Sequence, residues 1–316
     1  MPLSENQIRQ RAEKIHWYHE FDFGSGVKTK PITSNGYLWA MTQRLLDKVD
    51  FRDKTVLDIG CWDGYWSFYA ERRGAKSVLA TDVNTQRWSK VEVDLKSAST
   101  APVPNEGFML AREVYNSKVE YNGDISVYDI ASLGKRFDIV LFLGVLYHLT
   151  YPMYALTQIR HVVDRNGFVV VESGVIEDDE RAYLDFYYGS EDGREPYRRM
   201  DPSNWVLPTR RCMRDMLKAN YFDIRNEDSI LHPDDAIKLA PRKLTKTEHL
   251  IQSVVRRICN RYSVPLERDP RYGRQVILAQ AAEKPDVNYL YAPLMDLHQY
   301  DTRFQEGVGG KPDRKP

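Results

Sequence analysis

The sequence is poor in cysteine and has no excess of charge of either sign. Its 316 residues include three cysteines, Cys61, Cys212 and Cys259, whose wide spacing gives neither a zinc-ligand pattern nor a disulfide framework. Lys and Arg number 45, as do Asp and Glu, so the formal net charge is zero. This balance excludes a global field that attracts nucleic acid or anionic membrane, and a polyanionic partner would need a local basic patch.

Long hydrophobic runs are also lacking. No segment is long and apolar enough to span a bilayer, and the N-terminal stretch MPLSENQIRQRAEKIHWYHEF has no apolar core of a signal peptide. Hydrophobic residues nevertheless make up 42% of the chain and charged residues 28%, as in an ordinary globular protein. We therefore expect a cytoplasmic protein with one full core and no membrane partner.

Segments with strand and helix patterns alternate along most of the chain. The expected strands are 55–59, 75–82, 117–123, 137–149, 167–173, 221–230 and 274–282. The expected helices are 5–20, 37–49, 65–73, 84–97, one before residue 117, 152–164, 209–219 and 244–261. This alternation predicts an α/β fold with a doubly wound sheet, because strands buried on both faces read as near-continuous apolar runs.

One domain accounts for most of the length. We expect a short helical N-terminal extension over 1–50, a main domain over 51–283 and a C-terminal tail over 284–316. The acidic and aromatic stretch 177–205 interrupts the strand–helix rhythm and is interpreted as an insertion in the main domain.

The turn after the first strand, Asp58-Ile59-Gly60-Cys61-Trp62-Asp63-Gly64, resembles a nucleotide-binding loop with one glycine replaced. A dinucleotide fingerprint needs glycine at three positions, and counting from Gly60 the other two are Trp62 and Tyr65. A nicotinamide-dependent oxidoreductase is therefore disfavoured, because Trp62 would crowd a pyrophosphate. A carboxylate at Asp58 would also repel a diphosphate.

S-adenosylmethionine (SAM) fits the same turn better, since it carries an ammonium and a sulfonium and no phosphate. Asp58 suits the ammonium, and Gly60 and Gly64 allow the backbone to pass close to the cofactor. Asp82, at the end of the second strand, is placed to accept both ribose hydroxyls. Cys61 and Trp62 complete the predicted cofactor loop.

The motifs VLDIGCWDGYWS and LATD resemble the glycine loop and acidic loop of class I SAM-dependent methyltransferases. The stretches GVLYHL, NWVLPT and WYHEFDFGSGVKTKP narrow the resemblance to the branch named for tRNA 5-methoxyuridine methyltransferases. That branch includes the wobble-uridine carboxymethyltransferase and many members encoded among glycan and natural-product genes. The resemblance implies a seven-stranded Rossmann-like methyltransferase sheet. Trp62 departs from its central glycine and suggests an aromatic wall beside the cofactor.

Further contacts follow from the resemblance at matching positions. Ser126 and Val127 should lie near the adenine, Leu143 and Gly144 should lend backbone to the cofactor, and Tyr147 should face the active site. Val127 and Leu143 are equally compatible with simple core positions.

Methyl transfer to nitrogen or oxygen requires removal of a proton from the acceptor, a task that suits a neutral imidazole. His148 follows the strand that meets the cofactor and is the first candidate for a catalytic base. Tyr147 is the second, as a hydrogen-bond partner of the nucleophile. His16 and His19 could fold over the pocket, but a surface or packing role is favoured for both.

The sequence says less about the methyl acceptor than about the methyl donor. Arg210 and Arg211 lie at the start of an expected helix and could pair with a substrate anion. Trp205 belongs to a set of aromatic residues suited to binding a sugar or planar molecule. The other members of that set are Tyr183, Phe186, Tyr187 and Tyr188, and a lid that merely packs is an equal alternative for all of them. A basic stretch with Lys243, Lys246, Arg256, Arg257 and Arg261 could contact tRNA phosphates or be a solvated helix face. Lys28 or Lys30 could grip the carboxylate of a carboxylated SAM.

We therefore predict a SAM-dependent methyltransferase that acts on an oxygen or nitrogen atom of a small-molecule acceptor, which contains a sugar or is a natural-product intermediate. A tRNA wobble-uridine (carboxy)methyltransferase and a catalytically silent SAM-binding partner subunit are the alternatives. No metal is expected.

Overall fold

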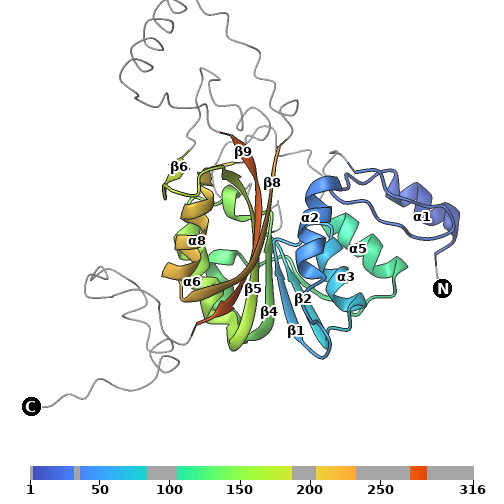
Figure 1. Ribbon diagram of the computed structural model, residues 1–316. Helices are drawn as coiled ribbons and strands as arrows, with labels where there is room; N and C mark the ends of the chain where they lie inside the picture. The colour runs from blue at the N-terminus through green and yellow to red at the C-terminus, as the bar shows by residue number, and fades with distance from the viewer. Residues whose placement is uncertain (1–2, 32–35, 84–104, 187–203, 233–270, 283–316) are drawn as a thin grey trace, which may run out of the picture.

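The computed structural model describes residues 3–31, 36–83, 105–186, 204–232 and 271–282 (Figure 1). Several sequence-based expectations lie outside these residues. They are the helices over 84–97 and 244–261 with their basic residues, the tail over 284–316, Cys259, Tyr187 and Tyr188.

A seven-stranded sheet forms the centre of the molecule, and the α/β prediction is confirmed. Its strands are β1 (Thr55–Ile59), β2 (Ser77–Thr81), β3 (Glu120–Asn122), β4 (Phe137–Leu143), β5 (Val163–Ile176), β8 (Phe222–Leu231) and β9 (Tyr272–Ala281). They lie in the order β3-β2-β1-β4-β5-β9-β8. All neighbours from β3 to β5 pair in parallel, whereas β9 is antiparallel to both β5 and β8.

The sequence of the central strands explains why they are central. β4 reads FDIVLFL, and its residues 139–142 are all at most 1% exposed. β5 likewise carries three consecutive buried valines, Val169–Val171. Such β-branched and aromatic runs suit strands that are covered on both faces. Because β1, β4 and β5 run parallel, their carboxyl ends share one edge of the sheet, where loops can assemble a site.

Helices cover the two faces of the sheet as separate layers (Figure 1). One layer contains α1 (Glu5–Ala12), α2 (Gly36–Leu46), α3 (Tyr65–Arg72) and α5 (Asn105–Val114). The other contains α6 (Pro152–Val162), α8 (Arg210–Ala219) and the 3₁₀ segment η2 (Val127–Leu133). Each layer closes over its own hydrophobic cluster, one around Leu45 and Phe68 and one around Leu156 and Phe142.

The N-terminal segment differs from its prediction, because the helix expected over 5–20 ends at Ala12. Beyond it, the indole of Trp17 donates to the carbonyl of Ala12 over 2.9 Å, and the Trp17 side chain is 1% exposed. The chain then doubles back, and the amide of Thr29 donates to the carbonyl of Phe21. The free energy gained by burying Trp17 and Phe21 in the first hydrophobic cluster exceeds that of continuing the helix.

The predicted insertion contributes a small second sheet. β6 (Leu184–Phe186) pairs antiparallel with β7 (Val206–Pro208), and the backbone of Ile176 bridges to Thr209. Among the residues that the structure describes, no helix is long and apolar enough to cross a membrane.

Candidate cofactor and acceptor site

The loop between β1 and α3 is built on two left-handed glycines. Gly60 has φ +74° and Gly64 has φ +80°. A Cβ atom on Gly60 would lie 2.4 Å from Cγ2 of Val145, and one on Gly64 would lie 2.4 Å from Cδ2 of Phe108. The amides of Gly60 and Cys61 donate to the carbonyl of Thr81. Both glycines are therefore required for conformation and for space, which explains the outer glycines of the motif.

Trp62 stands where the motif has its central glycine, and it adopts that residue's backbone conformation with φ +48°. Its side chain is 42% exposed, so a large ring lies at the surface of the predicted cofactor loop. Its amide donates to Oδ2 of Asp82 over 2.8 Å, and the amide of Val83 donates to Oδ1 over 2.7 Å. The end of β2 is thus tied to the loop through one carboxylate, whose pKa is raised by burial.

Asp58 is buried beneath the loop, with 2% exposure. The hydroxyl of Ser67, in α3, donates to Oδ2 of Asp58 over 2.5 Å. Burial raises the pKa of Asp58 to about 7, and the negative charges of Asp82 and Asp63 act in the same direction. A cationic group near this cluster of three carboxylates would offset the repulsion between their negative charges, whereas a phosphate would increase that repulsion.

Asp63 and His19 are parts of the site that the sequence analysis underestimated. His19 is 5% exposed, and its Nδ1 lies 2.7 Å from Oδ1 of Asp63. The amides of Tyr18 and His19 donate to Oδ2 of the same carboxylate over 3.1 and 2.9 Å. The packing alternative for His19 therefore describes it better than a surface position, while His16 is exposed.

A buried polar cluster lies behind the end of β4. Oη of Tyr147 accepts from Nη2 of Arg274 over 3.1 Å, and the guanidinium lies 4.5 Å from the centre of the Tyr147 ring. Arg274 is also held by Glu172 through contacts of 2.6 and 2.9 Å. A Cβ on Gly144, which has φ +75°, would approach Glu172 and Tyr147 only to 3.8 Å. Gly144 therefore borders this cluster.

The remaining predicted residues lie around the same edge. Ser126 caps η2 by accepting the amide of Tyr128, and Val127 is 6% exposed, as its core interpretation requires. Leu143 ends β4. The ring of His148 lies 4.2 Å from that of Tyr147, in the 3₁₀ segment η3 (Leu146–His148) that directly follows Gly144 and Val145. The Cys61 thiol is buried, which raises its pKa well above the ordinary value and keeps it protonated.

The two arginines predicted to bind a substrate anion contact carboxylates of the protein. Arg210 pairs with Asp179, lies 3.8 Å from Glu177 and donates to the hydroxyl of Ser229. Arg211 donates to Asp215 over 2.8 Å and is half-exposed. A substrate anion would have to compete with these acids.

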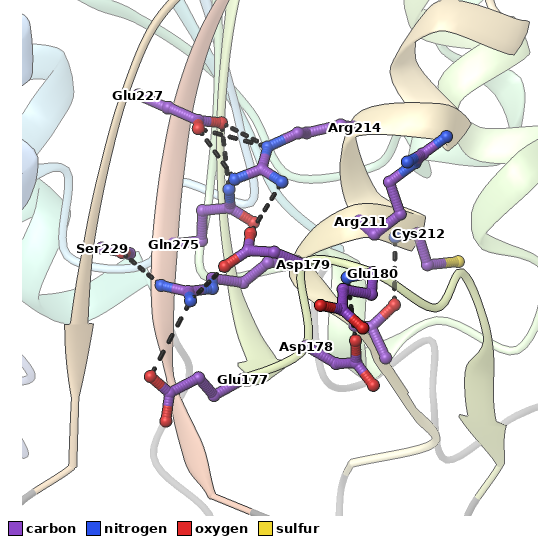
Figure 2. Close-up of polar contacts among 12 residues, drawn as sticks. Glu177, Asp178, Asp179, Glu180, Arg211, Cys212, Arg214, Glu227, Ser229 and Gln275 are labelled. Atoms are coloured by element: carbon purple, nitrogen blue, oxygen red, sulfur yellow. Dashed lines mark hydrogen bonds and ion pairs between the residues drawn. The ribbon is translucent and has the colours of Figure 1, made fainter.

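Arg214, in the same helix, binds both Glu227 and Asp179 (Figure 2). Trp205 directly precedes β7, and its amide donates to the carbonyl of Tyr147 over 2.8 Å. Its ring is 6.1 Å from that of Phe186, in β6. An aromatic pair is therefore joined through the backbone of Trp205 to the Tyr147 cluster.

Sheet order, glycine loop and strand-end acids together define an S-adenosylmethionine-dependent methyltransferase. The chain matches the model of the family described as "Methyltransferase domain" over residues 35–208, and it belongs to that family. Its cofactor is S-adenosylmethionine.

Curated relatives include a tRNA U34 carboxymethyltransferase of Actinobacillus succinogenes, 29% identical over 198 residues. These residues are 58% of this chain and 53% of the relative. A protein of the same name from Pseudomonas aeruginosa is 27% identical over 164 residues, which are 52% of this chain and 44% of the relative. The chain thus spans about half the length of the curated relatives it matches.

Solved structures show the same fold. The N-terminal domain of EvdMO1, crystallised in the presence of SAH and D-fucose, superposes with a TM-score of 0.53 at 14% identity. The match covers 89% of this chain and 98% of that domain.

The loop residues fit the cofactor of the family. Each oxygen of Asp82 accepts one backbone N–H, and an ionised carboxylate has about four acceptor positions, so capacity remains for ribose hydroxyls. The negative charges of Asp82 and Asp63 beside Asp58 match an ammonium group. The two left-handed glycines allow Val145 and Phe108 to pack directly against the loop backbone.

Proposed function

We propose that the protein transfers a methyl group from S-adenosylmethionine to an oxygen or nitrogen atom of a small molecule, a sugar-containing or natural-product intermediate. One observation carries this proposal: the ring of Phe186, in β6, lies 6.1 Å from that of Trp205, whose backbone is bonded to Tyr147, a member of the polar cluster with Glu172 and Arg274. Phe186 is 52% exposed, and its neighbour Trp205 is joined to the backbone of Tyr147. Rings beside a few fixed polar groups suit a sugar or planar acceptor.

The cofactor supplies a methyl group activated by its sulfonium. In this proposal Asp58 pairs with its ammonium and Asp82 accepts its ribose hydroxyls. Ser126 and Val127 border the adenine. Backbone atoms of the loop and of the end of β4 form the rest of the proposed cofactor site. They belong to Gly60, Cys61, Trp62, Gly64, Leu143 and Gly144.

His148 and Tyr147 are the residues proposed to act on the acceptor. His148 accepts the proton that the attacking oxygen or nitrogen loses, as general base. Tyr147, fixed by Arg274, orients the acceptor by a hydrogen bond. The short η3 segment keeps the two rings in contact, so the base and the orienting group approach the acceptor together.

Modification of the tRNA wobble uridine is the second candidate, and the names of the curated relatives favour it. The charges of the described residues favour a small molecule. Arg210, Arg211 and Arg214 are all bound to carboxylates. Lys28, one of two lysines considered for a carboxylated donor, lies 3.3 Å from Asp22 and 4.0 Å from Glu20. Lys30 is exposed.

Transfer of label from S-adenosylmethionine and, in a parallel reaction, from its carboxylated form distinguishes the two candidates. The purified chain is incubated with a small-molecule extract and, separately, with total tRNA lacking the modification. We expect label in the small-molecule fraction, and no tRNA retained by the protein at 150 mM salt. Label in nuclease-sensitive material, with binding that falls steeply as salt rises, would replace the proposal with the tRNA function.

A further inference from the structure

The N-terminal segment is attached to the cofactor loop through the carboxylate of Asp63. That side chain is 1% exposed and accepts two backbone amides, of Tyr18 and His19, together with Nδ1 of His19. Its Oδ1 also lies 3.4 Å from the amide of Tyr65, at the start of α3. A residue of the loop is therefore bonded on one side to a segment more than forty positions earlier, at separations of 44 and 45.

The His19 ring is enclosed by aromatic side chains that fix its plane. It stacks on Tyr65 with ring centres 4.7 Å apart and planes 14° apart. Trp66 meets it edge-on at 5.8 Å, and Trp39 lies at 5.1 Å. The carbonyl of His19 accepts from the hydroxyl of Thr29, which closes the segment on itself. Because the ring cannot turn without disturbing these contacts, it holds the Asp63 carboxylate in one orientation.

Asp63 lies between Trp62 and Gly64, two of the three loop residues whose backbone is left-handed, the third being Gly60. A tryptophan at φ +48° is disfavoured on its own and needs support from its surroundings. One support is the bond from its amide to Asp82, and the other is the anchored residue that follows it. A continuous path of contacts thus leads from His19 through Asp63 and the Trp62 backbone to Asp82.

We propose that His19 is a positioning residue for the cofactor loop and acts through Asp63 and the backbone of Trp62. This inference rests on the proposed cofactor contacts of Asp58–Gly64 and Asp82. His19 contributes to affinity for S-adenosylmethionine without touching it, because it stabilises the loop in the conformation that presents Asp82. Binding of the cofactor stabilises the N-terminal segment in return.

The test is calorimetric titration of the full chain with S-adenosylmethionine, at a temperature where circular dichroism shows every variant folded. His19→Ala should raise the Kd roughly tenfold. His19→Asn keeps an N–H donor near the position of Nδ1 and should restore the Kd to within about threefold of wild type. His16→Ala, an exposed histidine of the same segment, is the matched control and should leave it unchanged.

A folded His19→Ala variant whose Kd stays within about twofold of wild type overturns the proposal, as does an equal loss in His16→Ala. Failure of the wild type to bind S-adenosylmethionine would instead overturn the cofactor site itself. Amide exchange of the wild type gives an independent measurement. The amides of Tyr18 and His19 should exchange more slowly when the cofactor is added, and unchanged exchange there also overturns the proposal.

Discussion

Binding of S-adenosylmethionine should release protons at and below neutral pH, because the carboxyl predicted to face its ammonium is partly protonated there. Burial and two neighbouring carboxylates raise the pKa of Asp58 to about 7 in the unliganded protein. An ammonium beside Asp58 stabilises the charged form and lowers that pKa again. The bound state therefore holds fewer protons than the free state at pH values below about 7.

The sign and size of the effect follow from this difference. With a free pKa of about 7 and a bound value below 5, the Kd at pH 5.5 should be roughly 25-fold higher than at pH 7.5. Affinity falls as the pH falls, and the window ends near pH 8, where the α-amino group of the ligand itself titrates. In the unliganded protein the titration of Asp58 changes the folding stability with pH in the opposite direction. Its raised pKa makes the fold less stable as the pH rises from about 4 to 7.

Titration calorimetry in two buffers of different ionisation enthalpy measures the released protons directly. We expect about one proton per ligand at pH 5.5 and about a quarter of one at pH 7.5. Asp58→Asn removes the titrating group and should abolish both the proton release and the pH dependence, while Asp82→Asn tests whether the second acid contributes. A wild type that binds with equal affinity at both pH values and releases no proton would refute the reasoning.

Three further substitutions test the site. Asp82→Ala should weaken cofactor binding by about 1–3 kcal/mol through loss of charge-assisted hydrogen bonds, and an unchanged Kd would remove Asp82 from the ribose contacts. His148→Ala should lower turnover by roughly 10²–10⁴-fold at intact cofactor affinity, and full activity would exclude it as the base. Gly60→Ala should reduce both thermal stability and cofactor affinity, because its Cβ would strike Val145. Gly134→Ala, also at positive φ but with nothing within 4 Å, is its control and should cost only the backbone strain.

The strands were predictable because their signal is local. β1 occurs at the predicted residues, and β4 forms the first part of a predicted apolar run that Gly144 ends. The first helix was overestimated for a tertiary reason. Trp17 lies in a stretch whose sequence is compatible with a helix. Its indole instead donates to the carbonyl of Ala12, and its ring is buried in the core.

The cofactor loop was predictable as a short motif, whereas contacts between distant residues were not. Glu172 and Arg274, which fix Tyr147, are 102 residues apart. Glu172 directly follows the apolar run 168–171, and Arg274 stands two residues before the apolar run 276–279. A charged residue at the end of such a run was the available signal. Arg210 was predicted to bind a substrate anion, but the sequence could not indicate that Asp179, 31 residues earlier, would occupy its guanidinium.

The position of β9 determines when the side of the molecule proposed to bind the acceptor is completed. This strand follows β8 along the chain and yet separates β8 from β5, so β8 has no place in the main sheet until β9 has been synthesised. The segment that carries the glycine loop and the paired strands β1, β2 and β4 emerges from the ribosome much earlier. The donor half can begin to fold while β5 still presents an open edge, and insertion of β9 then closes that edge and delivers Arg274 to Tyr147.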